Sequence, residues 1–98
     1  YVGGVDYQIS VELQTLEQNF SKKDAKNSIE NLALQVIIID GHTNKLIAAQ
    51  TFSIAVSAAP NAVGGVKAAD QGLAQLMPKI IDFIIQKIYF LNSSSLSE

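Results

Sequence analysis

The sequence contains no cysteine, and this absence removes several kinds of chemistry at once. Without thiols the chain cannot form a disulfide, a thiolate metal site or a cysteine nucleophile. It contains no arginine either, because all seven of its basic residues are lysines, and its formal net charge is −2. Arginine is the residue most suited to binding phosphate groups and guanine bases. The sequence therefore argues against a nucleic-acid-binding protein.

Long uninterrupted hydrophobic runs are also lacking. The longest apolar stretch covers residues 80–91, and Asp82, Gln86 and Lys87 interrupt it. A membrane-spanning helix needs ~20 predominantly apolar residues in succession. We therefore predict no membrane span in this sequence.

Hydrophobic residues, by contrast, are abundant, at 48% of the 98 residues. This content is too high for a disordered chain, and the length is that of one small domain. We predict a single domain over residues 1–98, with its structured part reaching from Asp6 to about Ile88. The terminal segment 92–98, "NSSSLSE", has little to bury and is predicted to be a flexible tail.

Three segments have the patterns of β-strands. Residues 5–13 and 45–56 alternate between two sets of side chains, as in a strand with one buried face. Residues 32–39, "LALQVIII", are rich in β-branched residues and predict a central strand. Leu16 is out of phase with the first segment, so that strand either ends there or carries a bulge.

Residues 66–88 change to the period of a helix. Apolar residues recur at three- and four-residue spacing with polar residues opposite, which predicts an amphipathic helix of about six turns. Pro78 lies within it and removes one backbone hydrogen bond, so we predict a kink over residues 74–77. The predicted core-facing stripe consists of Val66, Ala69, Leu73, Leu76, Met77, Ile80, Ile84 and Ile88.

The order of these elements predicts an α+β fold. Three antiparallel strands in a meander leave one apolar face, and one long C-terminal helix packs on it. Two forms of this fold remain open at the level of sequence. The unit is either sufficient by itself or half of a larger α/β sandwich, which another part of the protein or another chain completes.

The only histidine, His42, lies in a short polar segment between the last two predicted strands, two positions after Asp40. A histidine acts as a base or ligand when a second group orients it in a water-poor cleft, whereas a hairpin tip is surrounded by water. We interpret residues 40–44 as a β-hairpin turn. In this interpretation Asp40 and Gly41 end one strand, and Asn44 takes a left-handed conformation.

The remaining polar motifs point to no catalysis. The acidic residues lack the arrangement of a catalytic carboxylate pair and are expected to be solvated. "NAVGG" at residues 61–65 precedes the helix, but Lys67 is followed by Ala68 instead of the Ser or Thr of a nucleotide-binding loop. We interpret it as a flexible hinge and helix start. We therefore predict no catalytic residue, no cofactor, no metal and no enzyme; the acids considered are Glu12, Glu17, Asp24 and Glu30.

The last turns of the helix are apolar on every side, and a helix end of this kind is buried by something. One interpretation is that the sheet edge or a further chain segment covers it. The other is that it meets a partner protein or a lipid. The residues predicted to make such contacts are Phe83, Ile88, Tyr89, Phe90 and Leu91.

Three segments together resemble one known family. They are "VDYQISVELQTLE" at residues 5–17, "LALQVIIIDGHTNKLIAAQTF" at residues 32–52 and "AADQGLAQLMPKIIDFI" at residues 68–84. The chain resembles the C-terminal part of the ABC-type transport auxiliary lipoproteins, the accessory components of MCE/Pqi-type (mammalian cell entry) lipid transport. In this resemblance Asn44 replaces a glycine of the hairpin turn, and the pair Asp82 and Phe83 stands in for an acid–tryptophan pair.

The resemblance implies a non-catalytic periplasmic protein. Its partners would be an MCE-family protein and the subunits of an ABC transporter, with lipid as a further contact. Members of the family carry an N-terminal half with a lipidated cysteine that anchors them to the outer membrane, and this cysteine is not present in the sequence. An open sheet edge would in addition allow oligomers to form by strand pairing.

Two functions are therefore expected. The first is an accessory component of an ABC-type, MCE-associated system that helps to move lipid or another apolar compound across the cell envelope. The second is an envelope assembly or regulatory module that binds another protein and no lipid, since fold alone does not decide function.

Overall fold

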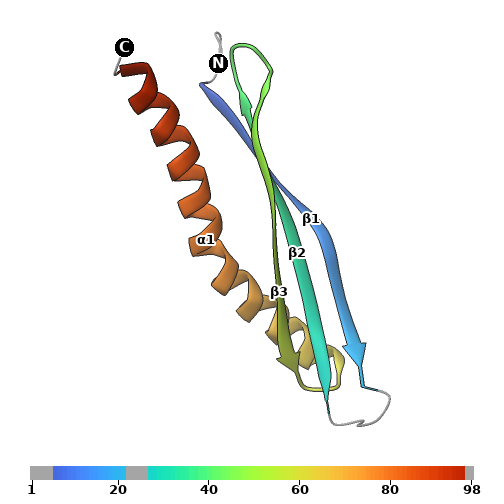
Figure 1. Cartoon of the computed structure of the whole chain (residues 1–98). Coiled ribbons are helices and arrows are strands. Elements are labelled where there is room, and N and C mark those ends of the chain that lie inside the picture. Colours follow the sequence, from blue (N-terminus) through green and yellow to red (C-terminus); the bar gives the residue numbers. More distant parts are fainter. Residues whose placement is uncertain (1–5, 22–26, 97–98) are drawn as a thin grey trace.

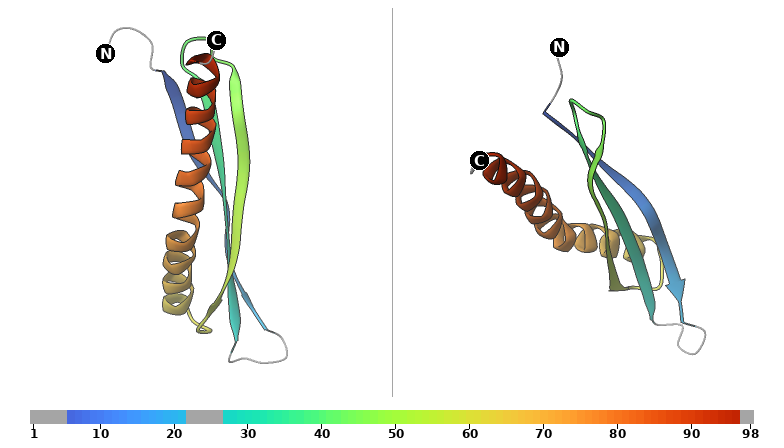
Figure 2. Two further views of the ribbon diagram at one scale, coloured as in Figure 1. Left: turned by 60° about the vertical axis from the view of Figure 1, so that its left-hand side comes forward. Right: turned by 45° about the horizontal axis from the view of Figure 1, so that its top comes forward.

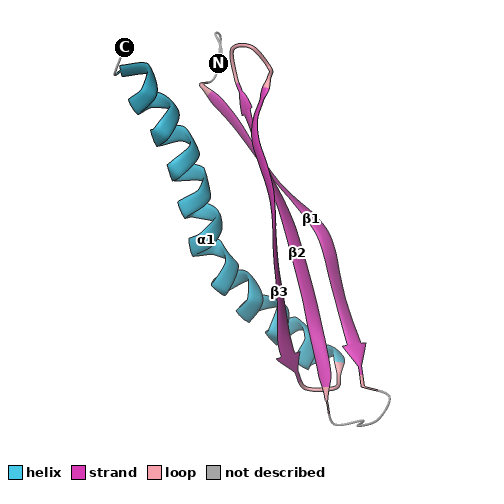
Figure 3. Cartoon of the chain, in the orientation of Figure 1, coloured by secondary structure: helices cyan, strands magenta, loops and turns pink. Residues whose placement is uncertain are grey.

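The computed structural model describes residues 6–21 and 27–96, so Val5 of the first predicted strand lies outside the described residues. The elements are β1 (Tyr7–Phe20), β2 (Ser28–Asp40), β3 (Leu46–Ala58) and α1 (Ala62–Leu96). The strands pair antiparallel in the order β1-β2-β3. α1 lies against one face of this open sheet (Figures 1 and 3). The predicted α+β fold, a meander with one long C-terminal helix, is confirmed.

β1 is longer than its alternating segment predicts, and a β-bulge accompanies the extension. The register with β2 shifts between Leu13 and Thr15, so Gln14 is an extra residue. Because successive strand residues point to opposite faces, the extra residue returns Leu16 to the face that holds Leu13. Of the two alternatives for Leu16, the bulge is therefore correct. The strand does not end there, and β1 continues to Phe20.

The core lies between the central strand and the helix. Alternate residues of β2 are buried toward α1, and α1 places Leu76 and Ile80 against them. Fully burying one large apolar side chain stabilises a fold by about 1.5–3 kcal/mol, so this small set holds sheet and helix together. The buried hydrophobic residues are Leu32, Leu34, Val36, Ile38, Phe52, Ala68, Leu76 and Ile80.

The first turn of α1 lies so close to its neighbours that two glycines are needed there. Asn61 caps the helix, since its Oδ1 accepts a hydrogen bond from the backbone N–H of Gly64 at 2.7 Å. A Cβ on Gly64 would collide with the backbone carbonyl of Ala59, and a Cβ on Gly65 would collide with the side chain of Gln18. This segment is thus a capped and tightly packed helix start, where the sequence suggests a flexible hinge.

α1 is also longer than predicted. Its 35 residues extend to Leu96, into the segment for which a flexible tail is predicted. Adding a residue to an existing helix costs far less than starting one, which explains how polar residues can prolong it. The helix bends along its length (Figure 2), and it contains Pro78, which cannot donate the backbone hydrogen bond of an interior helical residue.

α1 does not cover the whole sheet. It packs against β3 and β2 and hardly touches β1 (Figure 2). Of the predicted core-facing stripe, Leu76 and Ile80 are 2% exposed, but Val66, Leu73 and Met77 are 70%, 41% and 40% exposed. The prediction that the entire stripe faces the core is therefore wrong, because the apolar side of α1 is wider than the part of the sheet that it covers.

The molecule is correspondingly elongated. Its principal extents are 59 × 28 × 18 Å and its radius of gyration is 17.9 Å, against about 12.5 Å for a compact domain of this length. Its accessible surface is 6973 Å², against about 5,400 Å² for a typical folded monomer of this mass. The excess, on the order of 1,500 Å², is about twice the ~800 Å² that one partner contributes to a standard protein–protein interface.

Candidate functional site

The polar segment around His42 is a turn stabilised by Asp40. One carboxylate oxygen of Asp40 accepts hydrogen bonds from the backbone N–H groups of His42 at 2.8 Å and Thr43 at 3.2 Å. Asn44 has a φ of 63°, the left-handed conformation predicted for it. The His42 ring is largely exposed, with Nε2 3.4 Å from Oδ1 of the exposed Asp6. These contacts are those of a β-hairpin turn, as the sequence predicts.

The same hydrogen bonds predict that the stability of the fold depends on pH. The amides of His42 and Thr43, in that order, hold the pKa of Asp40 below its ordinary value of 3.8. A carboxyl whose pKa is lowered by folding stabilises the fold above its unfolded pKa, and this contribution is lost as the pH falls through the folded pKa. We expect wild type to gain stability relative to Asp40→Asn as the pH rises from 3 to 5, and the gap to stay constant above pH 6.

Urea unfolding of the two proteins across this pH range measures the effect. The other carboxyl groups titrate equally in both, so the difference isolates Asp40. If the difference in stability between wild type and Asp40→Asn did not change with pH, the hydrogen bonds to the Asp40 carboxylate would not lower its pKa.

The acidic residues divide into two kinds. Glu12 and Glu17 lie on the open face of the sheet and are exposed, as expected. Asp24 lies outside the described residues. Glu30 departs from the expectation of a solvated carboxylate, because its side chain faces α1 and is only 5% exposed. The alternation of β2 could have indicated this, since Glu30 lies two positions before Leu32 in the buried row.

The helix-end residues occupy different environments. Phe83 is partly buried and stacks edge-to-face on Phe52, with ring centroids 5.5 Å apart and an interplanar angle of 72°. Ile88 is half-buried, and Tyr89 is 70% exposed. The other two predicted contact residues belong to α1 but their side chains lie outside the described set; they are Phe90 and Leu91.

Two rows of exposed apolar side chains form the most extensive candidate surface. The β1 row lies on the helix-facing side of the sheet, beyond the reach of α1, and its members are 43–58% exposed: Ile9, Val11, Leu13, Leu16 and Phe20. The α1 row recurs every four residues along the helix and is 40–70% exposed: Leu73, Met77, Ile81, Ile85 and Tyr89. Groups of exposed large apolar side chains mark interaction sites in proteins. The sequence predicts a buried face for Ile9, Val11 and Leu13 and a core-facing stripe that includes Leu73 and Met77, and the structure leaves all five exposed.

The lower end of β1 and the start of α1 enclose a hollow of about 320 Å³. Glu30 lines it together with Gln18, and apolar groups form most of the remaining wall. The residues lining this hollow are Leu16, Glu17, Gln18, Glu30, Ala62, Gly65, Val66 and Ala69.

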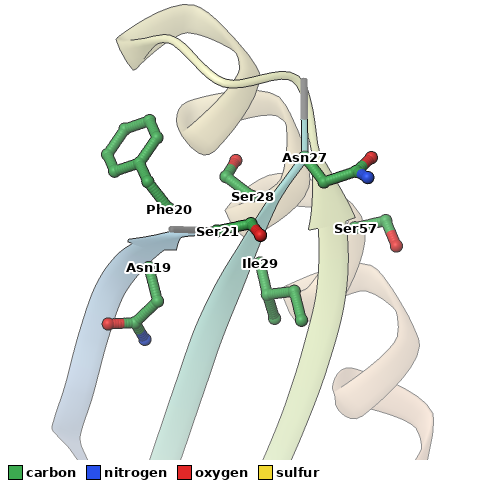
Figure 4. A pocket seen from close by; sticks show the side chains of 7 residues that line it. All are labelled: Asn19, Phe20, Ser21, Asn27, Ser28, Ile29 and Ser57. Carbon is green, nitrogen blue, oxygen red and sulfur yellow. The ribbon is translucent and has the colours of Figure 1, made fainter. Parts of the chain in front are cut away.

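A second hollow, of about 540 Å³, lies at the end of the sheet (Figure 4). Its lining residues come from both faces, because Phe20 and Ser28 pair on the helix side while Asn19 and Ile29 pair on the opposite side. It therefore wraps around the end of the sheet and does not present one set of converging groups.

Among residues 6–21 and 27–96, no group of three or more His, Cys, Asp or Glu side chains could hold a metal ion. Within the same residues, α1 has no window that is long and apolar enough to cross a membrane.

Comparison with known proteins gave no match. No family model matches the chain, and neither the curated proteins nor the solved structures include one with significant similarity.

Proposed function

We propose that this chain is a non-catalytic accessory component of an ABC-type, MCE-associated transport system. It assists the passage of lipid or another apolar compound across the cell envelope through contacts with an MCE-family protein or a transporter subunit. The transport assignment comes from the sequence resemblance. In this proposal the protein acts in the periplasm, and a lipidated cysteine outside the present sequence anchors it to the outer membrane.

The observation that carries the proposal is the pair of exposed apolar rows. The β1 row and the α1 row remain uncovered although neighbouring residues form a packed core. Exposed apolar surface of this extent is costly for an isolated domain and is removed from water when another element packs on it. The elongated shape supports the same conclusion, because the excess surface is larger than the area that one partner buries in a standard interface.

The positions of the polar residues support a role without catalysis. A general base needs to lie within hydrogen-bond reach of a reacting group in a sheltered site. His42 is in an exposed turn at the opposite end of β2 from Glu30. The groups that could act as acid and base are thus far apart along the strand.

A second function, an envelope assembly or regulatory module that binds protein and no lipid, is favoured by the shape of the apolar surface. The rows are open, and the hollow beside them is small, at about 320 Å³. Open apolar rows suit a packed protein element better than they suit an enclosed ligand.

Charge substitutions in the two rows test the proposal. Val11→Lys and Ile81→Lys each place a charge on an apolar row, and Thr51→Lys places the same charge on the opposite face of the sheet as a control. We expect both row variants to bind the MCE protein at least tenfold more weakly, with unfolding midpoints close to wild type, and Thr51→Lys to bind normally. Affinity is measured with the purified partner, and lipid that co-purifies is identified by mass spectrometry.

Two results would separate the alternatives. Binding to an unrelated envelope protein without lipid, lost in the row variants, would favour the assembly module. Equal binding by all three variants would show that neither row contacts the partner.

A further inference from the structure

Glu30 is a buried carboxylate that has no partner among the described residues. Its side chain is 5% exposed, and among the described residues it makes no hydrogen bond and no ion pair. No buried side-chain oxygen in the described part of the chain lacks both a hydrogen bond and solvent contact, so the Glu30 oxygens reach solvent through the hollow that they line. Burying a carboxylate without a partner is costly. This cost is recovered if a cation enters the hollow.

Gln18 supplies a further acceptor at the same place. Its Nε2 donates to Oγ of Ser28 at 3.0 Å and to the carbonyl oxygens of Ala59 at 3.1 Å and Asn61 at 2.9 Å. Because both carbonyls only accept, these bonds fix the orientation of the amide and direct its oxygen elsewhere. No described residue donates to that oxygen.

The free acceptors converge beside Gly65. A Cβ placed on Gly65 would lie 3.2 Å from Oε2 of Glu30 and closer still to Oε1 of Gln18. The two oxygens therefore lie close together on the wall of the hollow next to Gly65, where the Gln18 amide occupies the space that a side chain at residue 65 would need. With the second carboxylate oxygen of Glu30, three acceptors are available, and an ammonium group has three donors.

We infer that the hollow between β1 and the start of α1 binds a primary alkylammonium group. Glu30 is its counter-ion, Gln18 accepts a further hydrogen bond, and Leu16, Val66 and Ala69 contact the alkyl chain. A volume of about 320 Å³ is at the lower end for ligand pockets and suits one side chain. The charged side chain on the helix-facing wall of the hollow is the carboxylate of Glu30, so the site selects against anions.

The structure favours a lysine side chain of a partner protein as the source of this group. Among the strands that the structure describes, β1 is an edge strand that pairs with β2 alone, so its other edge is open to an added strand. Its charged residues are both acids, Glu12 and Glu17. Like charges opposed across a strand pair are destabilising, so β1 is poorly suited to pairing with its own copy and well suited to a basic segment. A side chain of that segment on the helix-facing side lies next to the hollow.

The first test uses n-butylammonium chloride and the isotopically labelled full chain. We expect saturable changes in the amide NMR signals of Gly65, Val66 and Ala69, with n-butanol and sodium chloride as controls that cause none. Glu30→Gln should weaken this binding at least tenfold, because a charge-assisted hydrogen bond is about twice as strong as a neutral one. Glu12→Gln removes the same charge from an exposed site on β1 and should bind as wild type does.

The stability of Glu30→Gln tests the premise separately. An unpartnered carboxylate can be neutralised without loss, so the variant should unfold at the same or a higher urea concentration. A clearly lower midpoint would show that Glu30 is paired within the folded chain, for example by one of its own lysines, and would overturn the proposal. Absence of saturable binding in wild type would overturn it as well.

The second test distinguishes the sources of the ammonium group. An alternating peptide of valine and threonine with one central lysine should bind wild type and lose at least tenfold in affinity when that lysine is acetylated. Binding to phosphatidylethanolamine vesicles and not to the peptide would contradict the protein source. Both tests use the purified chain alone, so a negative result would not contradict the proposed transport function. Conversely, the ammonium site does not depend on the transport function.

Discussion

Leu76→Ala is expected to lower the free energy of unfolding by about 3–4 kcal/mol. Leu76 is 2% exposed and lies between α1 and the buried residues of β2 and β3. Truncation removes three heavy atoms, Cγ and both Cδ, from a core that has only eight buried hydrophobic residues among those described. A core this small has few neighbours that could close the cavity, so most of the loss persists. Urea or thermal unfolding of the variant measures it.

Leu73→Ala is the matched control, because Leu73 is the same residue type one turn earlier but belongs to the exposed α1 row. At 41% exposure it should cost only about 1–1.5 kcal/mol, since a large part of its surface stays in water after folding. Equal losses at the two positions would mean that α1 covers β1 as well. The two exposed rows would then not exist as described.

Phe83→Ala is expected to cost about 2–3 kcal/mol, below the 3–5 kcal/mol typical of a fully buried ring. Phe83 is only partly buried, but it packs edge-to-face against Phe52 and lies under the ammonium of Lys87, whose Nζ is 5.8 Å from the ring centroid. Edge-to-face pairs contribute about 0.5–1.5 kcal/mol beyond the area that they bury. A double-mutant cycle with Phe52→Leu should recover a coupling in that range.

Tyr89→Ala provides the comparison, since Tyr89 is an aromatic residue of the same helix that is 70% exposed. It should change stability by less than about 0.5 kcal/mol. The sequence grouped Phe83 and Tyr89 as contact residues of one kind. If Phe83→Ala left stability unchanged and weakened only partner binding, that grouping would be right and the core contact with Phe52 would be unimportant.

Much of the fold follows from local patterns in the sequence. The β-branched central strand and the turn with Asn44 in a left-handed conformation match the structure, because each depends on neighbouring residues alone. The alternation of residues 45–56 holds from Ala48 onward, but the register with β2 shifts at Ile47 and places Leu46 on the face opposite to Ala48. Leu16 shows how a break in the pattern carries information. Its shift in phase indicates either a strand end or a bulge, and only the pairing with β2 decides between them.

The candidate surface could not be predicted in the same way. Periodicity identifies which residues of α1 are apolar, but whether Leu76 or Leu73 is buried depends on which strands the helix covers. The position of the helix on the sheet depends on tertiary packing. Three strands are wider than one helix, so α1 can lie toward β3 and leave β1 uncovered. Glu30 is the opposite case, because the alternation of β2 assigns it to the buried row and only its charge suggested solvent.

Site-specific photo-crosslinking in cells tests most directly whether the exposed rows are a docking surface. A photoreactive residue is placed at Val11 of the β1 row, at Ile81 of the α1 row, and at Thr51 on the opposite face of the sheet as control. The proposed function predicts crosslinks from Val11 and Ile81 to an MCE-family protein or an ABC transporter subunit, and none from Thr51. No crosslink from either row, or the same products from all three positions, would contradict it.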